Sequence, residues 1–246
     1  MFGQRKRSRE GLAWEWPHPE DEVVPGVKWG RPEWVPSPAF WKALAKLSHP
    51  TKDSFISEPG TPLISEVAFC LLGGYGIRME VNRAAFQLLQ SEGCFQTGNR
   101  PHTNDIERLL RRPLNVEGKL IRYRFPRQRA ERLSGAIRMI EEMSFPIYDF
   151  REFRRALMII PGIGPKTASW ITRNWLGSND VAILDIHILR GCKMMGLFRG
   201  NIRLPQDYER LEELFLEFAR NIDVPASLLD AIMWREMRVL GAHFSR

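Results

Sequence analysis

From about residue 61 onward, apolar residues recur every three or four positions, which is the spacing of one face of a helix. Strand-like alternation is scarce, and most of the apolar stretches end at glycine or proline, which terminate helices. We therefore expect an all-α protein. The expected helices cover about 61–74, 80–93, 104–112, 126–143, 148–160, 165–176, a stretch beginning at 185, 207–222 and 227–244.

The first 60 residues lack this helical spacing and carry many prolines and five tryptophans. Prolines this dense exclude a long helix. We expect an irregular strap that lies across the body and buries its tryptophans; an arm that contacts the substrate is the alternative. The tryptophans are Trp14, Trp16, Trp29, Trp34 and Trp41.

These patterns divide the chain into four parts. They are a Pro/Trp-rich extension (1–60), a helical lobe (61–147), a hairpin with a following aspartate (148–199) and the closing helices (200–246). A chain of 246 residues is long enough for one large domain or for two lobes around a cleft. No run of about 18 apolar residues is present, so no transmembrane helix is expected and a cytoplasmic, nucleoid-associated location is the default.

The net charge of the chain narrows the range of partners and therefore of functions. The net charge is +7 and the isoelectric point is near 9.6, which favours an anionic partner such as nucleic acid. The basic run "RKRSR" at 5–9 is expected to be a solvated tail that touches DNA non-specifically. The three cysteines suit a reducing compartment, have no metal-ligand spacing and exclude an iron–sulfur cluster held by four cysteines.

The stretch "PGIGPK" lies between two expected helices. Gly162 and Gly164 let the backbone turn, and Ile163 can pack the two helices together from inside the turn. The helix that follows points its free N–H groups at one spot, where a DNA phosphate fits regardless of base sequence. A plain helix–helix corner is the alternative.

A run of arginines interleaved with aromatic residues, "RYRFPRQRAERL" (122–133), is the second basic feature. Such a run can follow a phosphate backbone; one solvated helix face with its loop is the alternative. The residues expected to contact DNA here are Arg124, Arg127 and Arg129.

Lys166 follows the turn and begins a largely apolar helix. An amine is a nucleophile only when uncharged, and burial and a helix N-terminus both favour the uncharged form. The sequence predicts both for Lys166, although most lysines are surface charges. Asp185 comes nineteen positions later, after the apolar strand-like run 181–184. It can cap the next helix, or it can balance positive charge on a sugar and manage a proton for the amine.

Together, "IIPGIGPKTAS" and "VAILDIH" resemble the helix-hairpin-helix DNA glycosylases, in which a hairpin carries a lysine and a later loop leads to an aspartate. The segments "GIGPKTASWITRNWLG", "AILDIHILR", "RFPRQRAERL" and "LLDAIMW" look like those of the small archaeal and bacterial 8-oxoguanine glycosylase/lyases. The resemblance covers roughly residues 61–240.

The resemblance implies an all-α monomer with two helical lobes around a cleft. It also implies a bifunctional glycosylase and AP lyase of base excision repair. In the family, the lysine attacks the sugar C1′ of a flipped nucleotide, the base leaves, and β-elimination through a Schiff base nicks the strand. Lys166 occupies that position and Asp185 the position of the family aspartate. His187 matches a histidine that contacts a phosphate, with a helix-surface histidine as the alternative. Tyr75 falls at the position that fills the gap in the base stack, where Asn or Gln is more usual.

Three residues are expected at the damaged base. Trp170 lies one helical turn after Lys166 and is either a pocket wall or core. Asp230 and Trp234 match the "LD…W" pattern of the small 8-oxoguanine enzymes, with a helix cap and a core tryptophan as the alternatives. Those enzymes carry a terminal lysine near the base, whereas this chain ends "GAHFSR".

The resemblance implies double-stranded DNA with a damaged base as the partner, no redox cofactor, no catalytic metal, and a monovalent cation held by the hairpin carbonyls. Three alternatives stay open: a DNA-binding module without catalysis, a monofunctional glycosylase, and a glycosylase for a base other than 8-oxoguanine. A non-catalytic module keeps the glycines but has no reason to hold Lys166 and Asp185 together.

Overall fold

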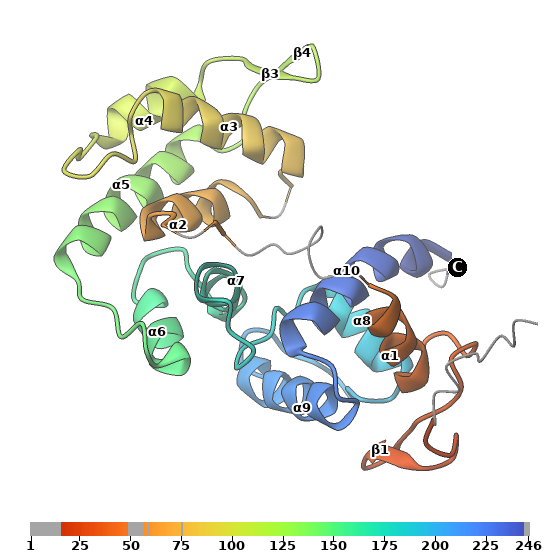
Figure 1. Ribbon diagram of the computed structural model, residues 1–246. Helices are drawn as coiled ribbons and strands as arrows, with labels where there is room; N and C mark the ends of the chain where they lie inside the picture. Colours follow the sequence, from red (N-terminus) through yellow and green to blue (C-terminus); the bar gives the residue numbers. More distant parts are fainter. Residues whose placement is uncertain (1–15, 49–56, 59, 75, 244–246) are drawn as a thin grey trace, which may run out of the picture.

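The computed structural model describes residues 16–48, 57–58, 60–74 and 76–243, and these residues are mostly helical (Figure 1). The helices are α1 (Pro38–Leu47), α2 (Leu63–Leu72), α3 (Met79–Ser91), α4 (Thr103–Leu110), α5 (Pro126–Glu142), α6 (Phe150–Leu157), α7 (Pro165–Leu176), α8 (Ile186–Met194), α9 (Tyr208–Asn221) and α10 (Ala226–His243). The strands are β1 (Glu22–Val24), β2 (Val27–Lys28), β3 (Leu114–Val116) and β4 (Lys119–Ile121). None of the described helices is long and apolar enough to cross a membrane.

One lobe is built by α2 to α5 with α6 and the first part of α7. Its core is a continuous cluster that runs from Val67 on α2 to Ile171 on α7. Helix α5 is its central element, because it packs against both α2 and α4. Leu133 and Ala136 of α5 and Phe153 of α6 are fully buried in this cluster.

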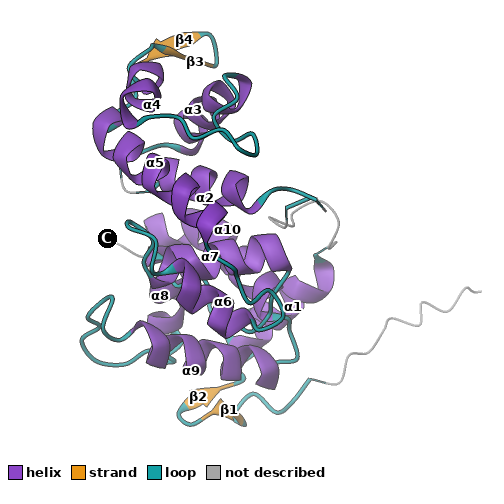
Figure 2. Cartoon of the chain, turned by 90° about the vertical axis from the view of Figure 1, so that its left-hand side faces the viewer, coloured by secondary structure: helices purple, strands orange, loops and turns teal. Residues whose placement is uncertain are grey.

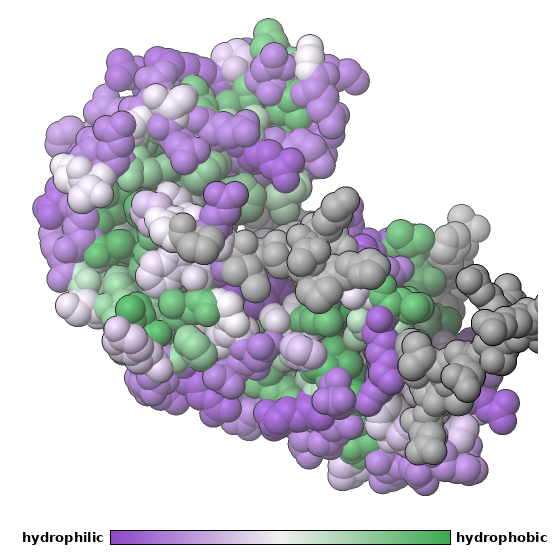
Figure 3. Space-filling model, viewed as in Figure 1, coloured by the Kyte–Doolittle hydropathy of each residue, from purple (hydrophilic) through white to green (hydrophobic). Residues whose placement is uncertain are grey.

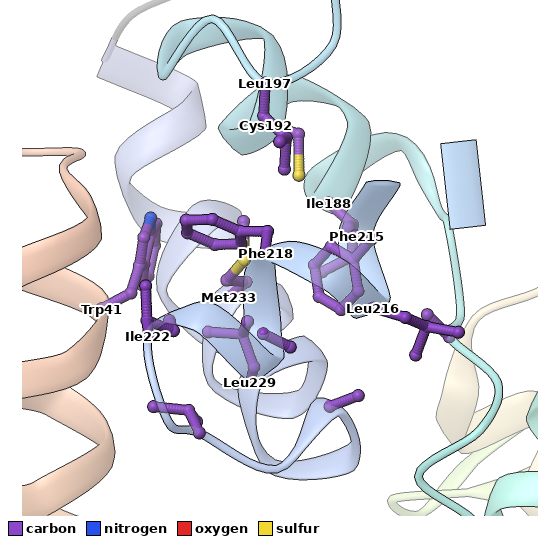
Figure 4. Packing of buried hydrophobic residues seen from close by; sticks show 14 of the residues in the cluster. Trp41, Ile188, Cys192, Leu197, Phe215, Leu216, Phe218, Ile222, Leu229 and Met233 are labelled. Carbon is purple, nitrogen blue, oxygen red and sulfur yellow. The ribbon is translucent and has the colours of Figure 1, made fainter. Parts of the chain in front are cut away.

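The other lobe is built by α8, α9 and α10, and the N-terminal extension completes it. Phe215 and Phe218 of α9 meet Met233 of α10 at the centre of its core (Figure 4). Trp41 of α1 closes the same cluster and is fully buried, with its indole Nε1 3.1 Å from the Met195 sulfur.

The hairpin helices α6 and α7 lie between the two sets of helices (Figures 1 and 2). Helix α7 packs against α2 and α6, while α8 packs against α10. The space-filling view is hollowed on one side between the lobes (Figure 3). The all-α, two-lobed prediction is therefore confirmed.

The extension differs from the expected irregular strap. It forms the β1–β2 hairpin and the regular helix α1. The helix is possible because Pro38 stands at its first position, where proline is tolerated, and the next proline is Pro50. Trp29 and Trp41 are buried as expected, but Trp34 is 48% exposed. Trp14 and the basic run at 5–9 lie outside the described residues.

A second hairpin, β3–β4, was not expected from the sequence. Its strands are only three residues long, and its turn uses Glu117 and Gly118, both at positive φ. Strands this short carry too few residues for an alternating pattern to stand out.

Candidate functional site

The turn between α6 and α7 requires glycine at one position. Gly162 has φ +93°, and a Cβ added there would lie 2.7 Å from the Cδ of Arg132, whose stem comes from α5. Ile163 is buried in the core of the first lobe, as predicted, so it ties the two helices together from inside the turn. A Cβ added at Gly164 would meet nothing within 4 Å, so this residue faces open space.

Helix α7 begins at Pro165, with Gly164 at its N-cap and no hydrogen bond from a side chain of the described residues to the cap. Its first N–H groups are therefore available to an external anion. Lys166 is the second residue of this helix, as expected, but it is exposed. The predicted burial of Lys166 is wrong: its helix turns its apolar residues, such as Ala168 and Ile171, into the core and leaves Lys166 at the cleft.

The apolar run 181–184 is buried but forms no strand, which corrects the strand-like expectation. Three side chains take the place of a neighbouring strand. Ala182 N–H donates to Glu212 Oε1 (2.9 Å), Ile183 N–H to Asp230 Oδ2 (3.3 Å) and Leu184 N–H to the Tyr208 hydroxyl (3.2 Å). The segment that leads to Asp185 is therefore held from α9 and α10.

Two arginines from the hairpin helices balance the buried carboxylates. Arg154 of α6 pairs with Glu212, and Arg173 of α7 pairs with Asp230. Ser169 of α7 also donates to Glu212, at 3.0 Å. The elements that carry Lys166 and Asp185 are thus joined by buried ion pairs. Removing one member of such a pair would leave a buried charge without its partner, so the two pairs hold α6 and α7 firmly against α9 and α10.

Burial raises the pKa of Asp230 to about 6, and the nearby Asp185 carboxylate adds to this, while Arg173 acts in the opposite direction. Burial also raises the pKa of the Tyr208 phenol, which therefore stays protonated and donates to the Ala182 carbonyl at 2.7 Å.

Asp185 is the N-cap of α8, as predicted. Its Oδ1 accepts from the N–H groups of His187 (2.8 Å) and Ile188 (3.0 Å). Its Oδ2 accepts no bond from the described residues, which leaves it free for a substrate. His187 has its ring Nδ1 buried, with no partner among the described residues. The two cap hydrogen bonds therefore fix the direction of the Asp185 carboxylate and engage only its Oδ1.

Two adjoining pockets lie between the lobes and share Met79 and Trp170. One holds Lys166 and Thr167 together with the end of α2 and the start of α3. The other holds Asp185 with Asp230 and Trp234. The structure thus brings together the residues predicted for catalysis and for the base.

The two alternatives raised for Asp230 and Trp234 have different outcomes. Asp230 lies within α10 and not at its start, so the helix-cap reading is wrong. Both of its oxygens are engaged by Arg173 and Ile183, and this gives it a positioning role at the pocket wall. Trp234 packs against the core of the second lobe and also lines the pocket.

The predicted arginines divide into exposed and buried residues. Arg124 and Arg127 are exposed at the start of α5. Arg129 is buried instead: its Nη2 donates to the Gly73 carbonyl at 2.8 Å, so it supports the turn after α2 and presents no charge to a phosphate. Tyr75, in the same turn, lies outside the described residues.

Sequence reasoning missed Glu212, Arg154 and Asn82. Glu212 could have been found, because it stands three and four residues before Phe215 and Leu216 on the buried face of α9. Asn82 stands three residues before the buried Ala85 of α3, so the same spacing could have indicated that it faces inward. Within the described residues, no group of three or more His, Cys, Asp or Glu could hold a metal ion.

Comparison with known proteins gives consistent results. Residues 54–224 match the family model of 8-oxoguanine DNA glycosylase, Ogg-HhH. An 8-oxoguanine DNA glycosylase/AP lyase of Metallosphaera sedula is 35% identical over 118 residues, which cover 46% of this chain and 57% of that protein. The protein of the same name from Picrophilus torridus is 28% identical over 176 residues, covering 70% of this chain and 77% of its own length.

Solved structures resemble the fold. The 8-oxoguanine DNA glycosylase of Thermotoga maritima aligns with a TM-score of 0.55 and 24% identity, covering 80% of this chain and 84% of its own. The Methanocaldococcus jannaschii 8-oxoguanine glycosylase/lyase, solved with a 15-mer DNA containing 8-oxoguanine, aligns with a TM-score of 0.56 and 24% identity, covering 79% and 89%.

Proposed function

This chain belongs to the 8-oxoguanine DNA glycosylase family, and from that premise we propose that it excises a damaged base, 8-oxoguanine, from double-stranded DNA and then nicks the strand. The observation that carries the proposal is one cleft that holds an exposed lysine at a helix N-terminus and, in the adjoining pocket, an aspartate with a free oxygen. We further propose that the protein is cytoplasmic and associated with the nucleoid, because its proposed substrate is DNA.

In this proposal, the uncharged amine of Lys166 attacks C1′ of the flipped nucleotide. The bond from C1′ to the base breaks, and its electron pair leaves with the base, which takes up the proton that the attacking amine gives up. Asp185 stabilises the positive charge on the sugar through Oδ2. The sugar ring then opens to a Schiff base on Lys166. Loss of a proton from C2′ expels the 3′ phosphate and nicks the strand.

We assign the grip on DNA to the hairpin and the neighbouring arginines. The backbone of Gly162 and Gly164 and the free N–H groups of α7 suit a phosphate. Arg124 and Arg127 are both exposed, and Arg124 lies beside the turn after α2, where an added Cβ on Gly76 would touch it. His187, at the start of α8, is assigned to a second phosphate, and Tyr75 to the gap left by the flipped base.

We also propose that the hairpin holds a monovalent cation. Within the described chain, no hydrogen bond uses the carbonyl oxygens of Pro161, Gly162 or Ile163. Carbonyl oxygens in one turn are the ligands that hard cations prefer. The cation would fix the turn while its N–H groups hold a phosphate.

Borohydride reduction tests the proposal. Wild-type protein with duplex containing 8-oxoguanine should release the base, nick the strand and form a covalent adduct when borohydride is added. Lys166→Gln should abolish nicking and adduct, whereas Lys193→Gln, an exposed lysine on α8, should leave both unchanged. Base release without an adduct would indicate a monofunctional glycosylase, and binding alone a DNA-binding module. A panel of duplexes with other damaged bases tests the choice of substrate.

A further inference from the structure

Strand β4 and the segment that leads from it to α5 expose every second side chain. The exposed residues are Leu120, Arg122 and Arg124, and the three residues that alternate with them are half-buried or buried. Alternate residues of an extended chain lie on one face. We call these three exposed residues the outward row; its apolar member, Leu120, is 76% exposed.

The opposite side of the hairpin is fixed to the core of the first lobe. Leu114 and Val116 of β3 are buried there, and the buried Tyr123 donates its hydroxyl hydrogen to the Leu72 carbonyl. Leu114 is the partner of Ile121 in the β3–β4 register. Because these contacts fix the inner side, the outward row is held toward solvent.

The outward row carries positive charge without an acidic partner. Between Leu114 and Phe125 the chain has three basic residues and one acidic residue, Glu117, which stands in the hairpin turn. No described residue makes an ion pair or a hydrogen bond with the Arg122 side chain. The nearby Arg111 and Arg112 differ, because each is paired with a glutamate. The Arg122 charge is therefore available to an external anion.

The outward row leads to the turn after α2. An added Cβ on Gly76 in that turn would lie 2.5 Å from Nη1 of Arg124, so this guanidinium lies against the turn. Four residues of extended chain span at most about 14 Å, which corresponds to roughly four base pairs of duplex at 3.4 Å each. The row therefore extends the proposed DNA surface from this turn toward the tip of the hairpin.

We propose that the outward row binds the sugar–phosphate backbone of duplex DNA on one side of the flipped nucleotide, beyond the contact of Arg124. Arg122 donates to a phosphate, and the apolar side chain of Leu120 covers the neighbouring deoxyribose. Such a contact is independent of base sequence. This inference rests on the proposed function, because that function supplies the duplex, and it adds a contact surface outside the catalytic cleft.

The salt dependence of binding tests the charged contact. The probe is a duplex with a central tetrahydrofuran nucleotide, a stable abasic analogue that is bound but not cut. Each phosphate contact contributes about 0.9 to the slope of log affinity against log salt concentration, so Arg122→Ala should reduce the slope by about that amount. Leu120→Ala should weaken binding several-fold at every salt concentration and keep the wild-type slope, because it removes apolar contact and no charge.

Arg220→Ala is the matched control, because it removes the same charge from an exposed site. Arg220 lies in the last turn of α9, at the opposite end of the molecule from the β3–β4 hairpin (Figures 1 and 2). This variant should keep both the affinity and the slope of wild type. Circular dichroism checks that the variants are folded.

The length of the duplex tests where the outward row binds. The two arms that flank the abasic analogue are shortened one base pair at a time, first on one side and then on the other. On one side, wild type should lose affinity at a length where Arg122→Ala loses nothing further. On the other side, both proteins should lose affinity equally. Equal losses on both sides would contradict the proposed contact.

Nicking of a duplex with a natural abasic site separates the two proposals, since it is assigned to Lys166. If wild type nicks this duplex but Arg122→Ala keeps the wild-type salt slope, the inference alone is overturned. It is also overturned if the free protein is a dimer that Leu120→Asp dissociates, because the outward row would then join two copies of the chain. No nicking and no binding by wild type would overturn both proposals.

Discussion

Glu212 offers the sharpest test of the buried network that holds the segment before Asp185. It is 5% exposed, pairs with Arg154 and accepts from Ser169 and from the Ala182 backbone N–H. In Glu212→Gln, the shape is kept, but an amide NH₂ replaces one oxygen and must face a donor. The change removes the buried carboxylate that pairs with Arg154 and leaves only the exposed Glu209 carboxylate, 3.6 Å away, to balance its charge.

The expected loss in the free energy of unfolding of Glu212→Gln follows from these contacts. Breaking a buried ion pair by removing one partner costs about 3–5 kcal/mol. Glu209 is the matched control, because it lies one turn earlier on α9 and its carboxylate is 3.6 Å from the same Arg154, yet its side chain is 69% exposed. Glu209→Gln should therefore cost about 0–1 kcal/mol.

The assay is urea unfolding of wild type, Glu212→Gln and Glu209→Gln at neutral pH, with the free energy of unfolding extrapolated to water. Nicking of an abasic duplex is measured under conditions where all three are folded. Glu212→Gln should also slow nicking more than Glu209→Gln does, because Ala182 stands three residues before Asp185. If the two variants lose the same free energy of unfolding, the reasoning about the network is refuted.

Three further predictions concern other parts of the molecule. The pKa of Asp230 is raised from 3.8 to about 6 in the folded protein, so the unfolded chain loses this proton at a lower pH than the folded chain does. Wild type should therefore lose stability relative to Asp230→Asn as the pH rises from about 4 to about 6. Unfolding of both proteins measured across that range checks this, and parallel stability curves would contradict it. Trp41→Ala should lower the free energy of chemical unfolding by about 3–5 kcal/mol, because the side chain is fully buried. Trp34→Ala, at a half-exposed site, should change it by no more than about 0.5 kcal/mol. Equal losses in the two variants would show that α1 is not part of the core. Gly162→Ala should weaken DNA binding in a titration, because φ at this position is +93° and the added methyl group would clash with an arginine. Gly200→Ala, also at positive φ but in open space, should bind DNA normally. Unchanged binding by Gly162→Ala would show that the hairpin does not contact DNA.

The helices and the hairpin could be predicted from the sequence because their signals are local. Helical spacing predicted α2 to α5, and the two glycines predicted the turn whose Gly162 does adopt positive φ. The cap at Asp185 is equally local, since the carboxylate bonds to N–H groups two and three residues later.

What the sequence could not predict depends on contacts between distant elements. The apolar run 181–184 looks like a strand, yet its hydrogen bonds go to side chains from α9 and α10. Arg129 belongs to a basic run, but the fold places the Gly73 carbonyl beside it and buries it. Lys166 was expected to be buried because its neighbours are apolar, whereas its helix faces the cleft on that side.

Mapping the lysine that carries the reduced DNA adduct tests the central claim most directly. After borohydride trapping on 8-oxoguanine duplex, trypsin digestion and mass spectrometry should find the sugar adduct on the peptide 156–173, which stays uncut at Lys166 because the modified lysine resists trypsin. An adduct on any other lysine, or base release and nicking with no adduct at all, would contradict the account.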